Sequence, residues 1–324
     1  MIPVVGYALS LAGLVWVYHG FDWKSQLPAL LRTDWRWVSL AVVTDISVYV
    51  LQGWRWSLLL SPLAHVSVLR SVQAIYIGLF ANEILPFRTG EAIRAFLQSR
   101  WAGLPFSATA SSVLLERFLD GCWLSLGFYL ASTRAPVPRY LIAAAHVLAI
   151  VLAVVAGLVV LAALRKGVAL PVTRRLPKFF LQIVHSLRCM TRSTSFAWAT
   201  LVSLAYLALQ VVPIYALFRG FGIELGFVPA AVVLVILRLG SIPPQAPSNV
   251  GAFQFFTVVA LQLFGIPKSQ AAAYATLLFV VVTVPLWVGG FFALLATRMR
   301  LGEIQAHAES QWNHLRTPSG VSRA

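Results

Sequence analysis

Charged residues are scarce in this chain, and acidic residues are the scarcest. Only ten of its 324 residues are Asp or Glu, and charged residues make up 11% of the total, against roughly 25% in soluble globular domains. The mean hydropathy is +0.82, and long apolar runs dominate. The shortage of charge excludes an ordinary soluble domain and indicates an all-α polytopic membrane protein.

Other signals of site chemistry are also missing. The two cysteines, Cys122 and Cys189, are too few for a disulfide framework, and the six histidines lack the spacing of metal ligands. No nucleotide-binding motif occurs. We therefore expect no metal and no cofactor.

Basic residues are plentiful, and their distribution indicates topology. The net charge is +15, which alone would suggest nucleic acid. However, seven Lys or Arg residues fall in the loop 165–192 and four more lie from Arg298 onward, as the positive-inside rule predicts for cytoplasmic segments. We expect no nucleic acid as partner, a multi-pass protein of the cytoplasmic (inner) membrane, and cytoplasmic N- and C-termini.

The hydrophobic pattern predicts about six full spans and two interrupted regions. The segment 4–21 lacks a basic n-region and a cleavage site, so we interpret it as a retained span. The regions 67–101 and 227–264 are broken by LPFRTG (85–90) and IPPQAPSNVG (242–251). Irregular backbone survives at membrane depth only inside protein or beside a wet cavity, so both regions are predicted to be re-entrant or broken helical hairpins. The predicted full spans are 4–21, 37–60, 107–131, 140–164, 196–218 and 270–297.

The two interrupted regions resemble each other. A Pro-x-x-x-Gly sequence begins at Pro86 and again at Pro247, and each is followed by a Gly-x-Pro turn and a full span. Three predicted spans separate them, so the hairpins would enter from opposite sides of the membrane. We predict one transmembrane domain, 1–300, built as an inverted-topology repeat of roughly 1–135 and 136–300. The polar tail 301–324 is predicted to be cytoplasmic and disordered.

Each broken region should present a helix N-terminus to the membrane interior. Such a terminus carries unpaired N–H groups and about half a positive charge, which favours phosphate or carboxylate. Thr89 is expected to cap the first half-helix, and Ser248 or Asn249 the second. Arg238, just before the second break, is a candidate gate or headgroup contact. The predicted headgroup-binding residues are Arg88, Thr89, Gly90, Arg94, Arg238, Ser248, Asn249 and Gly251.

Carboxylates and arginines cluster around the first break. Glu116 and Asp120 lie four residues apart inside the predicted span 107–131, where two like charges repel. An arginine from elsewhere, Arg88 or Arg94, would relieve the repulsion. A structural set of ion pairs that pins the hairpin to its neighbours is the alternative. Residues 91 and 94, and residues 117 and 120, are three apart and are predicted to pair. The predicted charge network contains Asn82, Glu83, Glu91, Glu116, Arg117 and Asp120.

Two further charges lie in the span 37–60. Asp45 is expected to be an interior carboxylate whose hydrogen bonds are satisfied. Arg55, between Trp54 and Trp56, is interpreted as an interfacial anchor at the cytoplasmic end of its span.

The segment 78–121 resembles the signature of the lysylphosphatidylglycerol synthetase transmembrane family (UPF0104), the flippase-like module of MprF-type proteins. The hydrophobic layout agrees over about 1–300, but this chain has Gln254 where the family often has Glu, and Phe279 near a common arginine. We expect no aminoacyl-transferase domain such as fused members carry, so the resemblance implies lipid translocation, or a role beside a lipid-modifying enzyme, without synthetase activity. The matching positions are Asn82, Leu85, Pro86, Arg88, Gly90, Glu91, Arg94, Glu116, Arg117 and Asp120.

The sequence thus predicts translocation of an anionic or phosphate-bearing lipid, with membrane lipids as partners and a homo-oligomer or a lipid-modifying enzyme as further possible partners. An alternative is a non-transporting accessory subunit of a biosynthetic complex for a membrane lipid or a lipid-linked glycan. An enzyme using Glu83 or Glu91 as base is disfavoured, because no histidine, acidic metal cluster or activated nucleophile lies nearby in the sequence. We therefore expect a protein that is not an enzyme.

Overall fold

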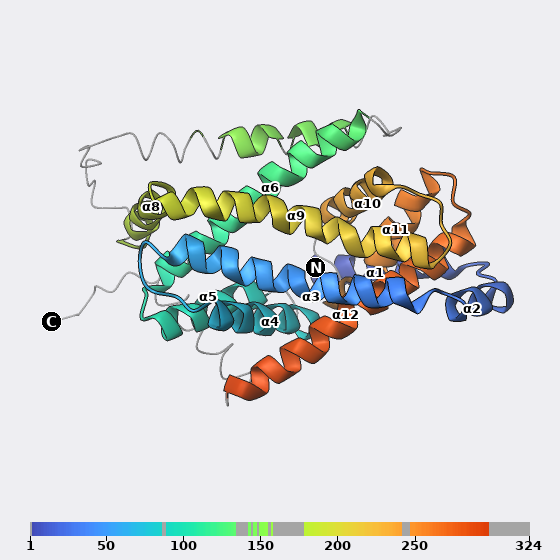
Figure 1. Cartoon of the computed structure of the whole chain (residues 1–324), viewed down its shortest axis with the longest axis horizontal. Coiled ribbons are helices and arrows are strands. Elements are labelled where there is room, and N and C mark those ends of the chain that lie inside the picture. The colour runs from blue at the N-terminus through green and yellow to red at the C-terminus, as the bar shows by residue number, and fades with distance from the viewer. Residues whose placement is uncertain are drawn as a thin grey trace.

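The computed structural model describes residues 2–85, 89–133, 178–241 and 247–297, with short pieces between 142 and 157. All regular structure in these residues is helical, which agrees with the predicted fold class (Figure 1). The helices of the first half are α1 (Ile2–Tyr18), α2 (Trp23–Leu31), α3 (Trp35–Leu60), α4 (Val68–Ile84), α5 (Gly90–Ala102) and α6 (Phe106–Ser132). Those of the second half are α8 (Lys178–Thr191), α9 (Thr194–Gly220), α10 (Phe227–Gly240), the 3-10 turn η2 (Pro247–Asn249), α11 (Ala252–Gln262) and α12 (Lys268–Thr297).

Among the described residues, three helices are long and apolar enough to cross a membrane: α3, α9 and α12, with 26, 27 and 30 residues, where about 20 suffice. They coincide with the predicted spans 37–60, 196–218 and 270–297. The predicted spans 4–21 and 107–131 lie on α1 and α6, and α6 is as long as α9 but carries three charges. The predicted span 140–164 and the tail 301–324 lie largely or wholly outside the described residues.

Both predicted breaks are present. The first interrupted region forms α4 and α5, and the second forms α10 and α11. The first pair is an antiparallel hairpin, because Arg70 near the start of α4 donates through Nη1 to the carbonyl of Trp101 at the end of α5 (3.4 Å). Nearer the break, a Cβ on Gly90 would lie 1.8 Å from the Gly78 carbonyl oxygen. The hairpin can therefore close only with a glycine at position 90.

The long helices α3 and α9 run antiparallel through the centre of the molecule (Figure 1). At one end, the Asp34 amide donates to the Gly220 carbonyl (3.0 Å). At the other, Arg55 Nη1 donates to Ser203 Oγ (3.4 Å). Each of these helices opens a series of long, short, short and long helices: α3 to α6 have 26, 17, 13 and 27 residues, and α9 to α12 have 27, 14, 11 and 30.

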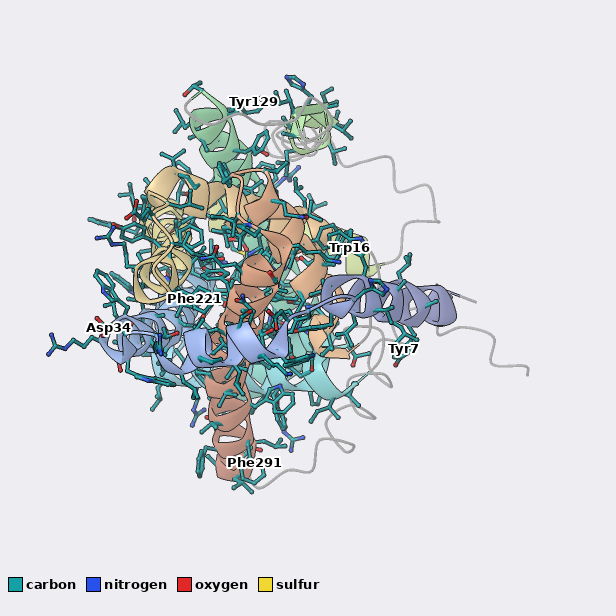
Figure 2. The ribbon with its side chains drawn as sticks, turned by 90° about the vertical axis from the view of Figure 1, so that its right-hand side faces the viewer. Tyr7, Trp16, Asp34, Tyr129, Phe221 and Phe291 are labelled. Atoms are coloured by element: carbon teal, nitrogen blue, oxygen red, sulfur yellow. The ribbon has the colours of Figure 1, made fainter. Side chains whose placement is uncertain are left out.

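Large apolar side chains cover much of the outside of this helical assembly. Tyr7 and Phe291 point away from it (Figure 2), and they are 47% and 50% exposed. Leu130 and Leu201 are similarly open. In water such a surface would aggregate, whereas hydrocarbon solvates it. The structure therefore agrees with a helical membrane protein.

Candidate functional site

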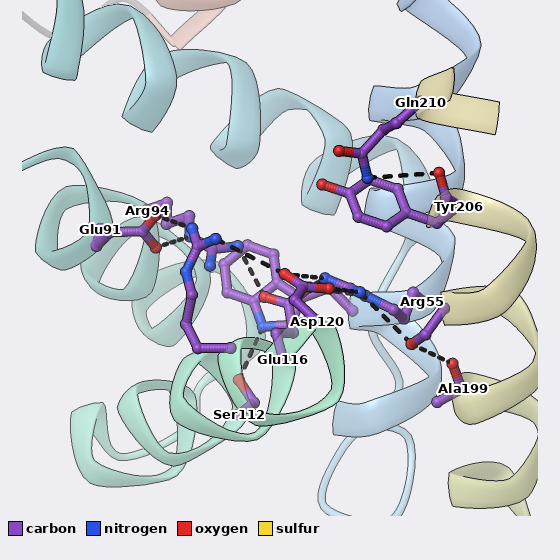
Figure 3. Close-up of polar contacts among 12 residues, drawn as sticks. Arg55, Glu91, Arg94, Ser112, Glu116, Asp120, Ala199, Tyr206 and Gln210 are labelled. Atoms are coloured by element: carbon purple, nitrogen blue, oxygen red, sulfur yellow. Dashed lines mark hydrogen bonds and ion pairs between the residues drawn. The ribbon is translucent and has the colours of Figure 1, made fainter. Parts of the chain in front are cut away.

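A network of buried and half-buried charges joins α3, α5 and α6 next to the first break (Figure 3). It contains three guanidinium groups and three carboxylates, and each guanidinium pairs with two carboxylates. Five of the six residues are site residues predicted from the sequence, whereas Arg55 was expected at the membrane interface. The members are Arg55, Glu91, Arg94, Glu116, Arg117 and Asp120.

Glu116 is the centre of the network and is fully buried. Its Oε1 accepts from Arg55 Nη2 (3.0 Å) and Nε (3.3 Å). Its Oε2 accepts from Arg94 Nη1 (2.8 Å). The expectation that an arginine from another segment stabilises this carboxylate is confirmed for Arg94. Because both oxygens are engaged, Glu116 holds α3, α5 and α6 together.

The remaining pairs extend the network towards the surface. Arg94 Nε donates to Glu91 Oε2 (2.7 Å), and Glu91 also pairs with Arg117. Asp120 pairs with Arg55 and, at 3.7 Å, with Arg117 Nη1. Both pairs predicted at a spacing of three residues are thus confirmed. The charges repel less than the sequence alone suggested, because three arginines balance three carboxylates.

Burial divides the network into a hidden part and an exposed edge. The side chains of Arg55, Arg94 and Glu116 are at most 2% exposed. Arg117, in contrast, is 46% exposed, with Glu91 and Asp120 partly open beside it. Arg117 lies near the middle of the 27-residue helix α6. In a helix that crosses a membrane, a charge at this position would need water, another charge or a polar ligand. This exposed edge is the part of the network that a ligand can reach.

The position of Arg55 in the structure differs from the prediction. It was interpreted as an interfacial anchor, but it is fully buried and bonded to Glu116 and Asp120. Its guanidinium carbon also lies 4.6 Å from the centre of the Tyr206 ring on α9. The neighbouring Trp56 is no interfacial residue either: it is buried, lies 4.9 Å from the Arg94 guanidinium, and donates through Nε1 to Ser112 Oγ (2.8 Å).

The buried position of Trp56 predicts a measurable contribution to stability. We expect Trp56→Phe to lower the free energy of unfolding by about 1–2 kcal/mol, because it removes one buried hydrogen bond and weakens a cation–π contact. Trp54→Phe, at a position 45% exposed on the same helix, should change it by less than about 0.5 kcal/mol. The free energies are measured by reversible unfolding in detergent. Equal changes for Trp56→Phe and Trp54→Phe would contradict the buried position of Trp56.

The caps of the two short helices differ from the prediction in a consistent way. Thr89 occupies the N-cap position of α5, but its side chain makes no capping bond. Instead, Asn82 Oδ1 on α4 accepts from the Gly90 amide (2.8 Å). In the second half the N-cap is Gly251, whose amide donates to Gln254 Oε1 (2.7 Å). An amide side chain thus accepts from a glycine amide at both breaks.

Ser248 and Asn249 therefore do not cap α11. Both have positive φ angles, 58° and 51°, in the turn η2 that precedes it. The Ser248 hydroxyl donates to the Glu83 carbonyl at the end of α4 (3.3 Å), and the Glu83 carboxylate accepts from Trp287 Nε1 (3.4 Å). Two breaks that are far apart in the sequence are consequently in contact.

A second polar group surrounds Asp45, in the half of α3 that precedes Arg55. Asp45 is 5% exposed, which confirms an interior position. However, its Oδ2 has no hydrogen-bond partner in the described part of the chain, so the expectation of a satisfied carboxylate is wrong for this oxygen. The exposed Arg238 on α10 donates to Gln210 Oε1 on α9.

Some predictions on the site cannot be compared with the structure. Arg88 lies outside the described residues. Among the described residues, no group of three or more His, Cys, Asp or Glu side chains could hold a metal ion. The residues that sequence reasoning missed are Arg55, Trp56, Tyr206 and Gln254.

The fold and site define a helical membrane protein whose interior holds a charge network beside a broken helix. Residues 4–306 match the family described as the lysylphosphatidylglycerol synthase TM region. The match covers nearly the whole chain, and the protein therefore belongs to this family, as the resemblance of its segment 78–121 indicated.

Two relatives are similar over most of their length. The chain is 24% identical over 290 residues to a UPF0104 membrane protein of Methanothermobacter thermautotrophicus, covering 82% of this chain and 84% of the relative. It is 23% identical over 329 residues to a UPF0104 membrane protein of Methanocaldococcus jannaschii, covering 93% and 95%. Both names describe a membrane protein and neither names a substrate.

Proposed function

We propose that the protein translocates an anionic or phosphate-bearing lipid across the cytoplasmic membrane and is not itself an enzyme. The observation that carries this proposal is the exposed edge of the charge network, where Arg117 is half open near the middle of α6. A phosphate-bearing headgroup that enters from the side would provide a polar partner at this depth. The description of the family as the TM region of a lipid synthase supports a lipid as the guest.

A spare donor in the buried part of the network supports the same ligand. In the described part of the chain, Arg94 Nη2 and Thr89 Oγ1 are buried and have no hydrogen-bond partner. Both belong to the beginning of α5, where the helix N-terminus favours negative charge. Since the six network charges balance to zero, a headgroup would bind first at the exposed edge, where Arg117 is accessible, and these buried groups and the helix N-terminus would become its further partners when the hairpin opens.

The arrangement of helices supports alternating access as the mode of transport. Under this proposal the two series that begin with α3 and α9 are an inverted-topology repeat, and their short pairs are re-entrant hairpins. Corresponding helices of such repeats run in opposite directions, as α3 and α9 do. The parallel extends to the breaks: a Cβ on Gly90 would lie 1.8 Å from the Gly78 carbonyl, and one on Gly251 would lie 1.9 Å from the Ser10 carbonyl.

Lipid movement in proteoliposomes tests the proposal. Arg117→Gln removes a charge from the exposed edge, but Glu91 keeps its ion pair with Arg94 and Asp120 keeps its ion pair with Arg55, so the variant should fold. We expect its rate of headgroup-labelled phospholipid or polyprenyl-phosphate translocation to fall by about ten- to a hundredfold, since a charge-assisted hydrogen bond contributes about 1.5–3 kcal/mol.

The exposed Arg36 at the start of α3 supplies the matched control, and Arg36→Gln should keep the wild-type rate. If wild type moves no lipid faster than empty liposomes, the transport function is wrong and an accessory subunit becomes the better account. If Arg117→Gln translocates lipid at the wild-type rate, the lipid headgroup does not pass the exposed edge.

A further inference from the structure

Asp45 is the buried carboxylate that the charge network does not use. It is the eleventh of the 26 residues of α3, about 15 Å along the helix from its start. At 5% exposure it is shut off from solvent, and its Oδ2 has no partner among the described residues. A charge at the bilayer centre costs at least about 2.5–3.5 kcal/mol on insertion scales and normally has a bonded partner. Asp45 therefore lacks a ligand that its position calls for.

Three helices carry the ionisable groups that interact electrostatically with Asp45. Arg238 on α10 interacts with it electrostatically, but its guanidinium donates a hydrogen bond to Gln210. Tyr49 on α3 and Tyr76 on α4 also lie within electrostatic reach of Asp45, and their rings are 5.0 Å apart. These phenols and one arginine are the titratable and charged groups that act on Asp45 in the described part of the chain.

A proton fits this environment better than a metal ion. Metal ions take several oxygen, nitrogen or sulfur ligands, and the described residues contain no cluster of three or more acidic, His or Cys side chains. A proton needs one oxygen, and a neutral carboxylic acid is tolerated in an apolar interior where a carboxylate without a partner is not. In the charge network, by contrast, both oxygens of Glu116 already accept from arginines, so a proton there would have to displace a guanidinium.

We propose that Asp45 is a proton-binding site that couples proton movement to lipid translocation. The coupling half of this inference rests on the proposed function; the proton site does not. A proton from one aqueous side forms an O–H bond at Asp45, and the same bond breaks when the proton leaves to the other side. The carboxylate left behind attracts Arg238 and competes with Gln210 for its guanidinium.

The position of Arg238 explains how this charge change reaches the lipid site. Arg238 is in the last turn of α10, directly before the second break, and the turn η2 within that break contacts Glu83 at the first break. On the other side, Tyr206 packs on Arg55 of the charge network and interacts electrostatically with Tyr49. Movement of Arg238 between Gln210 and Asp45 would therefore act on both hairpins.

Infrared difference spectroscopy of the purified full-length protein, titrated with pH, tests the proton site without any transport assay. We expect wild type to show the C=O stretch of a protonated carboxylic acid, and Asp45→Asn to lose this band. Asp22→Asn is the matched control, because Asp22 is an exposed helix cap and asparagine also caps; it should keep the band. A band that persists unchanged in Asp45→Asn, or its absence from wild type, would overturn the proton site.

A second variant guards against misfolding of Asp45→Asn. Arg238→Gln removes the cation that favours the ionised carboxylate of Asp45. The band should therefore persist in this variant and, as the pH is lowered, appear at a pH about one unit higher than in wild type. An unchanged titration would show that Arg238 does not respond to the proton on Asp45 and would overturn the proposed coupling route.

Coupling is tested in proteoliposomes that contain a trapped pH indicator. Lipid movement by wild type should be accompanied by a pH change, whereas Asp45→Asn should move lipid down its gradient without one. If Asp45→Asn still moves protons with lipid, the coupling is wrong. If wild type moves no lipid, the proposed function and the coupling both fail, and the infrared band alone decides whether Asp45 binds a proton.

Discussion

Replacing Glu116 by Gln should lower the free energy of unfolding by about 3–5 kcal/mol, the usual cost of removing one partner from a buried ion pair. The side chain keeps its size, but Arg55 and Arg94 lose the carboxylate that bonds both of them at distances of 2.8–3.3 Å. The buried part of the network would then hold two positive charges without their shared counter-ion. Reversible unfolding in detergent measures the effect.

Two further variants distinguish this explanation from a general intolerance of the site. Glu224→Gln removes an exposed carboxylate and should change the free energy of unfolding by less than about 0.5 kcal/mol. Glu116→Gln combined with Arg94→Met should be less unstable than the sum of the two single variants, because it removes a cation together with its anion. Strict additivity would show that Glu116 and Arg94 do not interact.

The second large effect concerns the close approach of α4 and α5. Gly90→Ala would place a methyl group 1.8 Å from the Gly78 carbonyl oxygen and 2.7 Å from Asn82 Oδ1. Neither backbone can yield without opening the hairpin, and the Gly90 amide would lose its bond to Asn82. We expect a loss of more than about 3 kcal/mol of stability and no lipid translocation.

Gly226→Ala is the matched control for this change. Its backbone angles are ordinary for alanine and nothing lies within 4 Å of the added Cβ, so stability should change by less than about 1 kcal/mol. If Gly90→Ala unfolds like Gly226→Ala, the two helices do not touch at position 90.

The breaks and most of the network could be predicted because they depend on local chemistry. Proline and glycine at 85–90 and 242–251 interrupt helices whatever surrounds them. Two carboxylates four residues apart in one span, Glu116 and Asp120, needed cations from elsewhere. The arginine beside the first break, Arg94, was one of two candidates, and the structure brings it to Glu116.

The neighbours of Arg55 and its helical position predict different locations for it. Two flanking tryptophans are typical of a membrane interface, yet position 55 lies on a stripe of buried residues spaced three or four apart along α3. That periodicity was visible in the sequence and would have placed Arg55 on the same face as Asp45. The buried stripe comprises Ala41, Asp45, Val48, Gln52, Arg55 and Leu59.

The caps and the free oxygen of Asp45 could not be predicted, because both depend on distances between helices. Thr89 and Ser248 are favourable capping residues locally. In the folded chain Asn82 reaches Gly90 from the preceding helix, and Ser248 instead donates to Glu83. Whether a buried carboxylate has a partner is likewise decided by where α10 places Arg238, which no local pattern reports.

The central claim is that a lipid headgroup passes the exposed edge of the charge network beside the first break. The most direct test is photolabelling of the protein in bilayers with a phospholipid whose headgroup carries the photoreactive group, followed by mapping of the labelled residues. We predict labelling of residues 82–94 and of α6 around Arg117, and its reduction in Arg117→Gln. Labelling confined to the outer apolar surface, at positions such as Leu130 and Phe291, would contradict the account.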